Sequence, residues 1–157
     1  SRKPIYSVTL DFMDAIWGAQ KRVTIDGKAR TIKIPAGVDN GSRIRFDDFD
    51  IIVGVSPHPM FRREGYDIIT EQDISMIQAA LGGIVEVETI DGGGKLKIPE
   101  GTQPQAIIRL RGRGIPEPHG RGRGDHYIRI KVLIPKKLSE RQKELLRQLE
   151  KEKKGWF

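Results

Sequence analysis

The chain has 157 residues, of which 37% are hydrophobic and 31% charged, with 28 Lys and Arg against 21 Asp and Glu. This balance is typical of a globular protein, and no apolar run approaches the roughly 20 residues that a membrane-spanning helix needs. The absence of cysteine excludes disulfides and thiolate metal sites. We therefore expect a cytoplasmic protein without a metal or other cofactor, whose formal net charge of +7 favours an acidic partner.

Short runs of apolar and β-branched residues predict strands in the N-terminal part of the chain. These runs span 6–10, 21–25, 30–34, 42–46 and 50–55. The stretch between the first two ends in Gly18, the residue type that usually follows a helix, so we expect one or two helical turns there. In "IKIPAG" at 32–37, the proline ends a strand because it removes a backbone donor, and Gly37 permits a positive φ. This motif predicts a chain reversal.

The same order of elements returns in the second half of the chain. Residues 10–46 align without gaps with 74–110, and "LKIPEG" at 96–101 repeats the turn. Ala15, Gly18 and Val23 each meet an identical residue in the second copy, as a shared core requires. Further strands are expected at 83–90, 95–98, 106–111 and 126–134. The repeat predicts two small, mainly β domains over 1–65 and 66–135.

A glycine-rich basic loop distinguishes the second copy from the first. If Asp125 is the counterpart of Asp50, the connection from Leu110 to Asp125 contains an insertion that the short connection from Phe46 to Asp50 lacks. The inserted stretch, "RGRGIPEPHGRGRG" at 111–124, has the composition of a loop that wraps nucleic acid, and also that of an ordinary solvated loop. The lack of an aromatic residue that could stack on a base favours the solvated loop.

The three histidines do not form a regular metal-binding pattern. His119 and His126 flank the inserted loop without the spacing of a metal site, so we expect both at the surface. Ser56 and His58 lie close together but lack the turn that presents a catalytic serine. We therefore predict no catalytic residue, no metal ligand and no enzymatic activity.

Residues 136–157 change character and predict a C-terminal helix. Ser139 and Gln142 have the spacing of a capping box, in which each side chain binds the other's backbone amide. Apolar side chains form a narrow stripe on the otherwise charged helix: Leu138, Leu145, Leu146 and Leu149. A helix of about 15 residues is marginal alone, so the stripe is expected to pack on its own domain or on a partner subunit.

Two strands of the first copy carry apolar side chains on one face. Tyr6 and Val8 alternate with polar residues in the first strand, as do Val23 and Ile25 in the second. One interpretation places these four side chains in the core. The other is an apolar groove beside a free strand edge, where an extended peptide adds a strand.

Several of these segments resemble the C-terminal region of the DnaJ family of co-chaperones. They include "IKIPAGVDNGSRIRF", "HPMFRREGYDI", "QAALGGIVEVETIDG", "LRGRGIP", "GRGDHYIRIKV" and "PKKLSERQKELL", in the order of the family. The resemblance implies two tandem β-sandwiches joined near residues 63–66, with short helices and a C-terminal helix that forms a homodimer. The dimer contacts would come from the leucine stripe of the helix.

The resemblance also assigns candidate site residues. The positions of the family's peptide groove match Tyr6, Val8, Val23, Ile25 and Phe61. The positions that bind an acidic tail of the partner ATPase match Lys21 and Arg22. The zinc module that many members carry would interrupt residues 25–30, which form a short connection without cysteine here, so zinc is not expected. The family's J-domain is absent from these residues.

The resulting prediction is a fragment that binds non-native polypeptides, dimerises and delivers clients to a DnaK-type ATPase. No membrane partner is expected. The alternative is a basic protein that binds nucleic acid through the loop at 111–124, and a third possibility is a purely structural dimerisation module. Peptide binding that resists salt distinguishes the first from the second, because nucleic-acid affinity falls steeply as salt rises.

Overall fold

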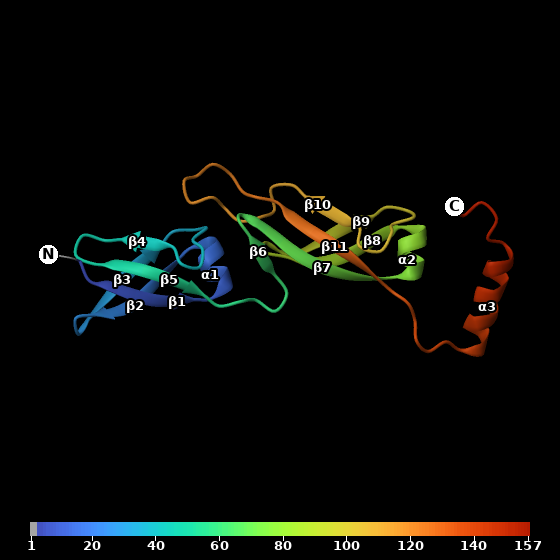
Figure 1. Cartoon of the computed structure of the whole chain (residues 1–157), viewed down its shortest axis with the longest axis horizontal. Helices are drawn as coiled ribbons and strands as arrows, with labels where there is room; N and C mark the ends of the chain where they lie inside the picture. Colours follow the sequence, from blue (N-terminus) through green and yellow to red (C-terminus); the bar gives the residue numbers. More distant parts are fainter. Residues whose placement is uncertain (1–2) are drawn as a thin grey trace.

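A computed structural model, which describes residues 3–157, contains two β-sandwiches that lie end to end, followed by a separate helix (Figure 1). This arrangement confirms the mainly β fold with short helices and a C-terminal helix. No helix among the described residues has the length and apolar character needed to cross a membrane.

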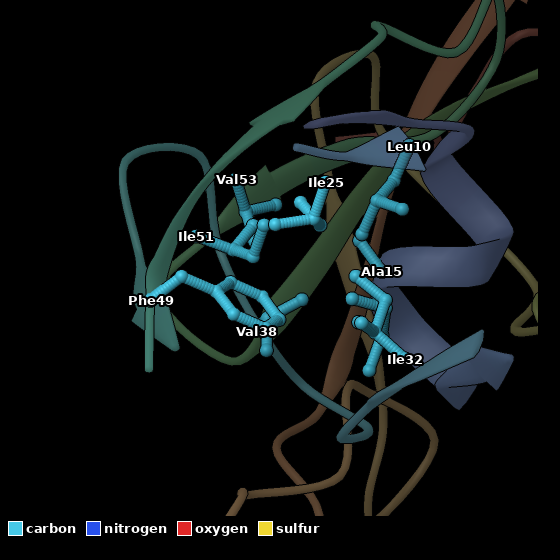
Figure 2. Close-up of a cluster of buried hydrophobic side chains, with 9 residues drawn as sticks. Leu10, Ala15, Ile25, Ile32, Val38, Phe49, Ile51 and Val53 are labelled. Atoms are coloured by element: carbon cyan, nitrogen blue, oxygen red, sulfur yellow. The ribbon is translucent and has the colours of Figure 1, made fainter. Parts of the chain in front are cut away.

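The first sandwich packs a three-stranded sheet against a hairpin. Its elements are β1 (Ile5–Leu10), α1 (Phe12–Trp17), β2 (Ala19–Ile25), β3 (Lys28–Ile34), β4 (Arg43–Arg45) and β5 (Asp50–Val55). The sheet has the order β1-β5-β4, with β1 parallel to β5, and the second layer is the antiparallel pair β2–β3. Both layers contribute to one apolar core, and Figure 2 shows Ile51 and Val53 on one side of Ile25, with Leu10 and Ile32 on the other.

The second sandwich repeats this plan with one additional edge strand. It comprises β6 (Arg62–Glu64), β7 (Asp67–Ser75), α2 (Met76–Leu81), β8 (Gly83–Thr89), β9 (Gly92–Ile98), β10 (Ile107–Leu110) and β11 (His126–Leu133). The sheet order is β10-β11-β7-β6, and β8–β9 forms the opposing hairpin. Its core is formed by Ile74, Val87, Leu96, Ile98, Ile128 and Ile130 with Ala79. Strand β6 lies along β7, whereas no described strand lies at the corresponding edge of β1.

The repeated turn holds each hairpin against its short helix. Helix α2 and strands β8 and β9 have the same lengths and spacing as α1, β2 and β3, in the positions that the gap-free alignment predicts. The amide of Gly37 donates to the carbonyl of Ala15 at 2.9 Å, and that of Gly101 donates to Ala80 at 3.1 Å. A Cβ added at Gly18 would lie 2.7 Å from the carbonyl oxygen of Ile34, so this close approach requires glycine. The motif therefore both ends a strand and fixes it to a helix end.

Strand register corrects the length of the insertion in the second copy. Ile44 pairs with Ile51 in the first sandwich, and its counterpart Ile108 pairs with Ile128 in the second. The counterpart of Asp50 is therefore Tyr127 and not Asp125, which makes the insertion longer by two positions than the aspartates suggest. The shared aspartate is misleading because hydrogen-bond pairing decides the register.

The C-terminal helix α3 (Glu140–Lys151) begins with the predicted capping box. The amide of Gln142 donates to the Ser139 hydroxyl at 3.1 Å, and the amide of Ser139 donates to the Gln142 side chain at 2.9 Å. No residue of the helix is buried, and Leu145 and Leu149 are 46% and 44% exposed. Figure 1 shows the helix at the far end of the second sandwich, away from α1.

Candidate peptide-binding site

Three of the predicted groove residues form a half-buried apolar strip. Tyr6, Val8 and Val23 pack with their inner sides against the first core, and each keeps part of its side chain exposed. We call these three residues the β1–β2 strip. Ile25, the fourth residue of the pattern, is only 6% exposed and belongs to the core itself. The strip is thus narrower than the four-residue pattern suggested.

The strip joins two strand edges from different layers. Strand β1 is an outer strand of its sheet and β2 pairs only with β3, so among residues 3–157 each leaves one edge without a strand partner. The prediction assumed that β1 and β2 could be neighbours in one sheet, but they face each other across the sandwich. Their apolar side chains meet because alternation turns Tyr6, Val8 and Val23 towards the shared core.

A tight turn places a carboxylate beside Tyr6. Asp26 and Gly27 connect β2 to β3 with φ values of 49° and 74°, the left-handed pair typical of a type I′ hairpin turn. The Tyr6 hydroxyl donates to Asp26 Oδ1 at 3.1 Å. Desolvation, and then the hydrogen bond to Asp26, raise the pKa of Tyr6. The raised pKa extends to higher pH the range in which the protonated hydroxyl can donate to Asp26.

The two cations predicted to hold an acidic tail lie on opposite faces of β2. Lys21 faces the same side as Val23, and its Nζ lies 2.8 Å from Asp14 Oδ2 of α1. The hydrogen bond to Asp14 raises the pKa of Lys21. Arg22 faces outward, is exposed and has no ion pair within residues 3–157. An incoming carboxylate would meet Arg22 unpaired, whereas Lys21 already has a partner.

Phe61 lies in a different part of the molecule from the strip. It is 5% exposed and packs in a third apolar cluster with Phe12, Ile16, Ile68, Ile90 and Ile115. The ring of His58 covers Phe61, with centroids 4.8 Å apart, and His58 Nδ1 accepts the amides of Met60 and Phe61. This cluster joins α1 of the first sandwich to the second sandwich, so we call it the joint.

The inserted loop is part of the joint. The sequence predicted an ordinary solvated loop, and that prediction was wrong for the part of the loop around Ile115. Ile115 is fully buried in the joint cluster. Arg123 donates two hydrogen bonds to Asp91, at 3.0 and 2.8 Å, and its guanidinium lies 5.1 Å from the centroid of the Trp17 ring. Tertiary contacts therefore order the root of the loop, and two of its four arginines, Arg113 and Arg123, pair with Asp91.

A largely buried arginine also holds the two sandwiches together. The guanidinium of Arg63 donates to the carbonyl oxygens of Gly37, in the repeated turn of the first sandwich, and of Val38, the next residue. Its side chain is only 10% exposed. Hydrogen bonds from a charged donor are stronger than neutral ones, so Arg63 links the connection between the sandwiches firmly to the first one.

The expectation of a surface histidine at 126 was wrong. His126 begins β11 and is fully buried, with Nε2 2.7 Å from the Thr70 hydroxyl and Nδ1 without a hydrogen-bond partner among residues 3–157. Burial lowers the pKa of His126. No sign of this burial is present in the sequence, because His126 directly follows a polar, glycine-rich loop. Only the pairing of β11 with β7 places His126 in the interior.

Residues 5–135, which contain both sandwiches, match the DnaJ C terminal domain family. The chain belongs to this family. Among curated relatives, the Chaperone protein DnaJ of Halothermothrix orenii is 48% identical over 130 residues, which cover 74% of this chain and 35% of that protein. The Chaperone protein DnaJ of Halalkalibacterium halodurans is 44% identical over 134 residues, covering 77% and 36%. That of Acetivibrio thermocellus is 40% identical over 161 residues, covering 89% and 42%.

The comparisons cover only part of this chain and part of each relative. The chain spans about a third of the length of the first relatives, and the DnaJ C terminal domain match ends before α3 begins.

Two surface hollows, of about 730 and 650 Å³, border the linker at 58–66 and lie away from the β1–β2 strip. In this DnaJ-type chain, the strip is therefore an edge of partly exposed side chains that lies outside both hollows.

Proposed function

We propose that this chain is the client-binding part of a co-chaperone and holds extended segments of non-native polypeptides at the β1–β2 strip. The observation that supports this proposal is the combination of half-exposed apolar side chains with the unpaired edge of β2. A client strand beside β2 would gain backbone hydrogen bonds from that edge and place alternate side chains against Val8 and Val23. Such a module breaks no covalent bond and needs no cofactor.

The expected affinity is low. Burying two or three client side chains contributes about 1.5–3 kcal/mol each, whereas association costs about 4–15 kcal/mol in lost freedom. Strand hydrogen bonds offset part of that cost, so binding is weak and reversible. Reversible binding suits a protein that passes its client to a second chaperone, and membership of the DnaJ C terminal domain family supports a DnaK-type ATPase in that role. Arg22 is then a candidate contact for an acidic tail of that partner.

We further propose that two chains associate through α3. Leu145 and Leu149 of this helix are exposed in the single chain, Leu146 and the preceding Leu138 are only partly buried, and an isolated helix of 12 residues is marginal. Packing the stripes of two helices together would bury them and stabilise both. Two strips in one dimer would raise the apparent affinity for a client long enough to reach both, through effective concentration.

A paired substitution tests the strip. The change Val8→Ser with Val23→Ser removes its aliphatic surface, and we expect at least a tenfold weaker binding of a dye-labelled apolar peptide, measured by fluorescence anisotropy. Val132→Ser is the matched control, because Val132 is also partly buried against a sandwich core but lies in the second sandwich. Unchanged peptide affinity in the doubly substituted protein, with its urea midpoint close to wild type, would reject the proposal.

A further inference from the structure

Each end of the β1–β2 strip carries a polar contact, one from β2 to α1 and one from β1 to the β2–β3 turn. At one end, Lys21 pairs with Asp14, with 2.8 Å between Nζ and Oδ2. At the other end, the Tyr6 hydroxyl donates to Asp26 Oδ1 at 3.1 Å. Val8 and Val23 lie between these contacts, so the exposed apolar surface has a polar boundary on both sides.

The two contacts differ in charge. Lys21 and Asp14 neutralise each other, whereas a neutral hydroxyl leaves the negative charge of Asp26 in place. Asp26 is exposed and has no ion pair within residues 3–157. The other carboxylate that acts on Tyr6, that of Asp48, lies 2.8 Å from Arg30 and is neutralised.

Lys28 is a cation two residues from Asp26 in the chain. Lys28 opposes Ile25 across the hairpin, but it belongs to β3, which lies behind β2 as seen from the free edge. The contact with Tyr6, in contrast, locates the Asp26 carboxylate between β1 and the hairpin, at the strip itself. A client strand lying along β2 would therefore pass Asp26 at closer range than Lys28.

The spacing of a strand converts this position into a sequence preference. Alternate side chains of an added strand face the same side and lie about 6.6 Å apart, so they follow the spacing of Lys21, Val23 and Ile25. A client side chain opposite Val23 fills the strip, and the side chain two positions farther along faces the Asp26 end. We propose that Asp26 selects clients in which a cationic residue lies two positions from the apolar one. This inference rests on the proposed function.

Matched peptides test the inference on the complete chain. A Gly/Ser nonapeptide with one central leucine carries Gln, Lys or Glu two positions before or two positions after the leucine, and binding is followed by fluorescence anisotropy. We expect Lys at one of the two positions to tighten binding about two- to fivefold over Gln, the range of an exposed ion pair, and Glu at that position to weaken it. The position that responds gives the direction in which the client lies.

Two variants assign the effect. Asp26→Asn keeps an oxygen that accepts the Tyr6 hydrogen bond but removes the charge, and we expect it to abolish the Lys preference while the Gln peptide binds as before. Glu86→Gln makes the same change of net charge on an exposed strand position of the second sandwich and should leave the preference intact.

The outcomes separate this inference from the proposed function. Suppose that the Gln peptide binds and that Val8→Ser with Val23→Ser weakens its binding. Equal affinities for the Lys, Gln and Glu peptides, or a Lys preference that survives Asp26→Asn, then overturn the selection by Asp26 but leave the proposed function standing. If the Gln peptide fails to bind the wild-type chain, the strip itself is not a client site and both proposals fall.

Discussion

A glycine substitution measures the contact between the inserted loop and the first sandwich. Gly37, in the repeated turn, has a φ of 86°, and a Cβ added there would lie 2.1 Å from the carbonyl oxygen of Pro116 in the loop. The methyl group of Gly37→Ala therefore cannot be accommodated unless the loop moves away. The loop is held by buried Ile115 and by the Arg123–Asp91 pair, so movement loses other contacts.

The expected loss has two parts that controls can separate. An alanine in the left-handed region costs about 1–2 kcal/mol, and forcing an extra carbon into a packed contact costs about 1–3 kcal/mol more. Gly41 has the same φ of 86° but open space around its Cβ position, so Gly41→Ala measures the first part alone. Gly101→Ala does so in the second sandwich, at the counterpart of Gly37, where nothing lies within 4 Å of the added carbon.

Urea unfolding followed by fluorescence gives the comparison. A Trp156→Phe background leaves Trp17, which lies under Arg123 at the joint, as the single tryptophan. We expect Gly37→Ala to lower the free energy of unfolding by about 2–5 kcal/mol and both controls by about 1–2 kcal/mol. If Gly37→Ala falls within about 0.5 kcal/mol of Gly41→Ala, the additivity error for independent sites, the inserted loop does not press on the repeated turn and the account of the joint is wrong.

Three further predictions use the same measurements. Ile115→Ala should cost about 2–5 kcal/mol and Ile107→Ala, at a position 57% exposed, less than about 1 kcal/mol; equal losses would show that the loop does not pack in the joint. Because burial lowers the pKa of His126, the unfolded state takes up the proton more readily. The contribution of neutral His126 to the free energy of unfolding is therefore fully present above about pH 6.5. It decreases, by at most about 1.4 kcal/mol per pH unit, as the pH falls below that value. His126→Gln should reduce this slope, measured between about pH 7.5 and 5.5. Leu145→Glu with Leu149→Glu should produce monomers in sedimentation, whereas Arg147→Gln with Lys151→Gln, an equal change of charge on the opposite face of α3, should not.

Local signals in the sequence were sufficient for most of the fold. The gap-free repeat predicted two copies of the same β unit, and the helices ending at Gly18 and Gly82 were found where glycine follows a short apolar run. Ser139 and Gln142 make the predicted capping box because all of its partners lie within one turn of the helix start. These features depend on neighbours in the chain, which the sequence displays directly.

The candidate site was only partly predictable for the opposite reason. Alternation identified Tyr6, Val8, Val23 and Ile25 as one apolar set, but it could not show that Ile25 is sealed in the core while the other three remain half-exposed. It also could not reveal Asp26 as the partner of Tyr6, because these residues are 20 positions apart and meet only when the β2–β3 hairpin packs against the sheet that contains β1. Burial depends on which layer covers a side chain, and periodicity contains no information about that layer.

By itself, then, the sequence determined the repeat, the strand and helix content, the capped C-terminal helix and the family resemblance, all of which follow from local periodicity and short motifs. Only the tertiary structure decided the role of the glycine-rich loop, the burial of His126 and Phe61, and the full extent of the insertion, which strand register fixes. These features depend on contacts between residues far apart in the chain. Such contacts form only when the strands pair and the two sandwiches pack together, and the composition of a loop does not state which surface it will meet.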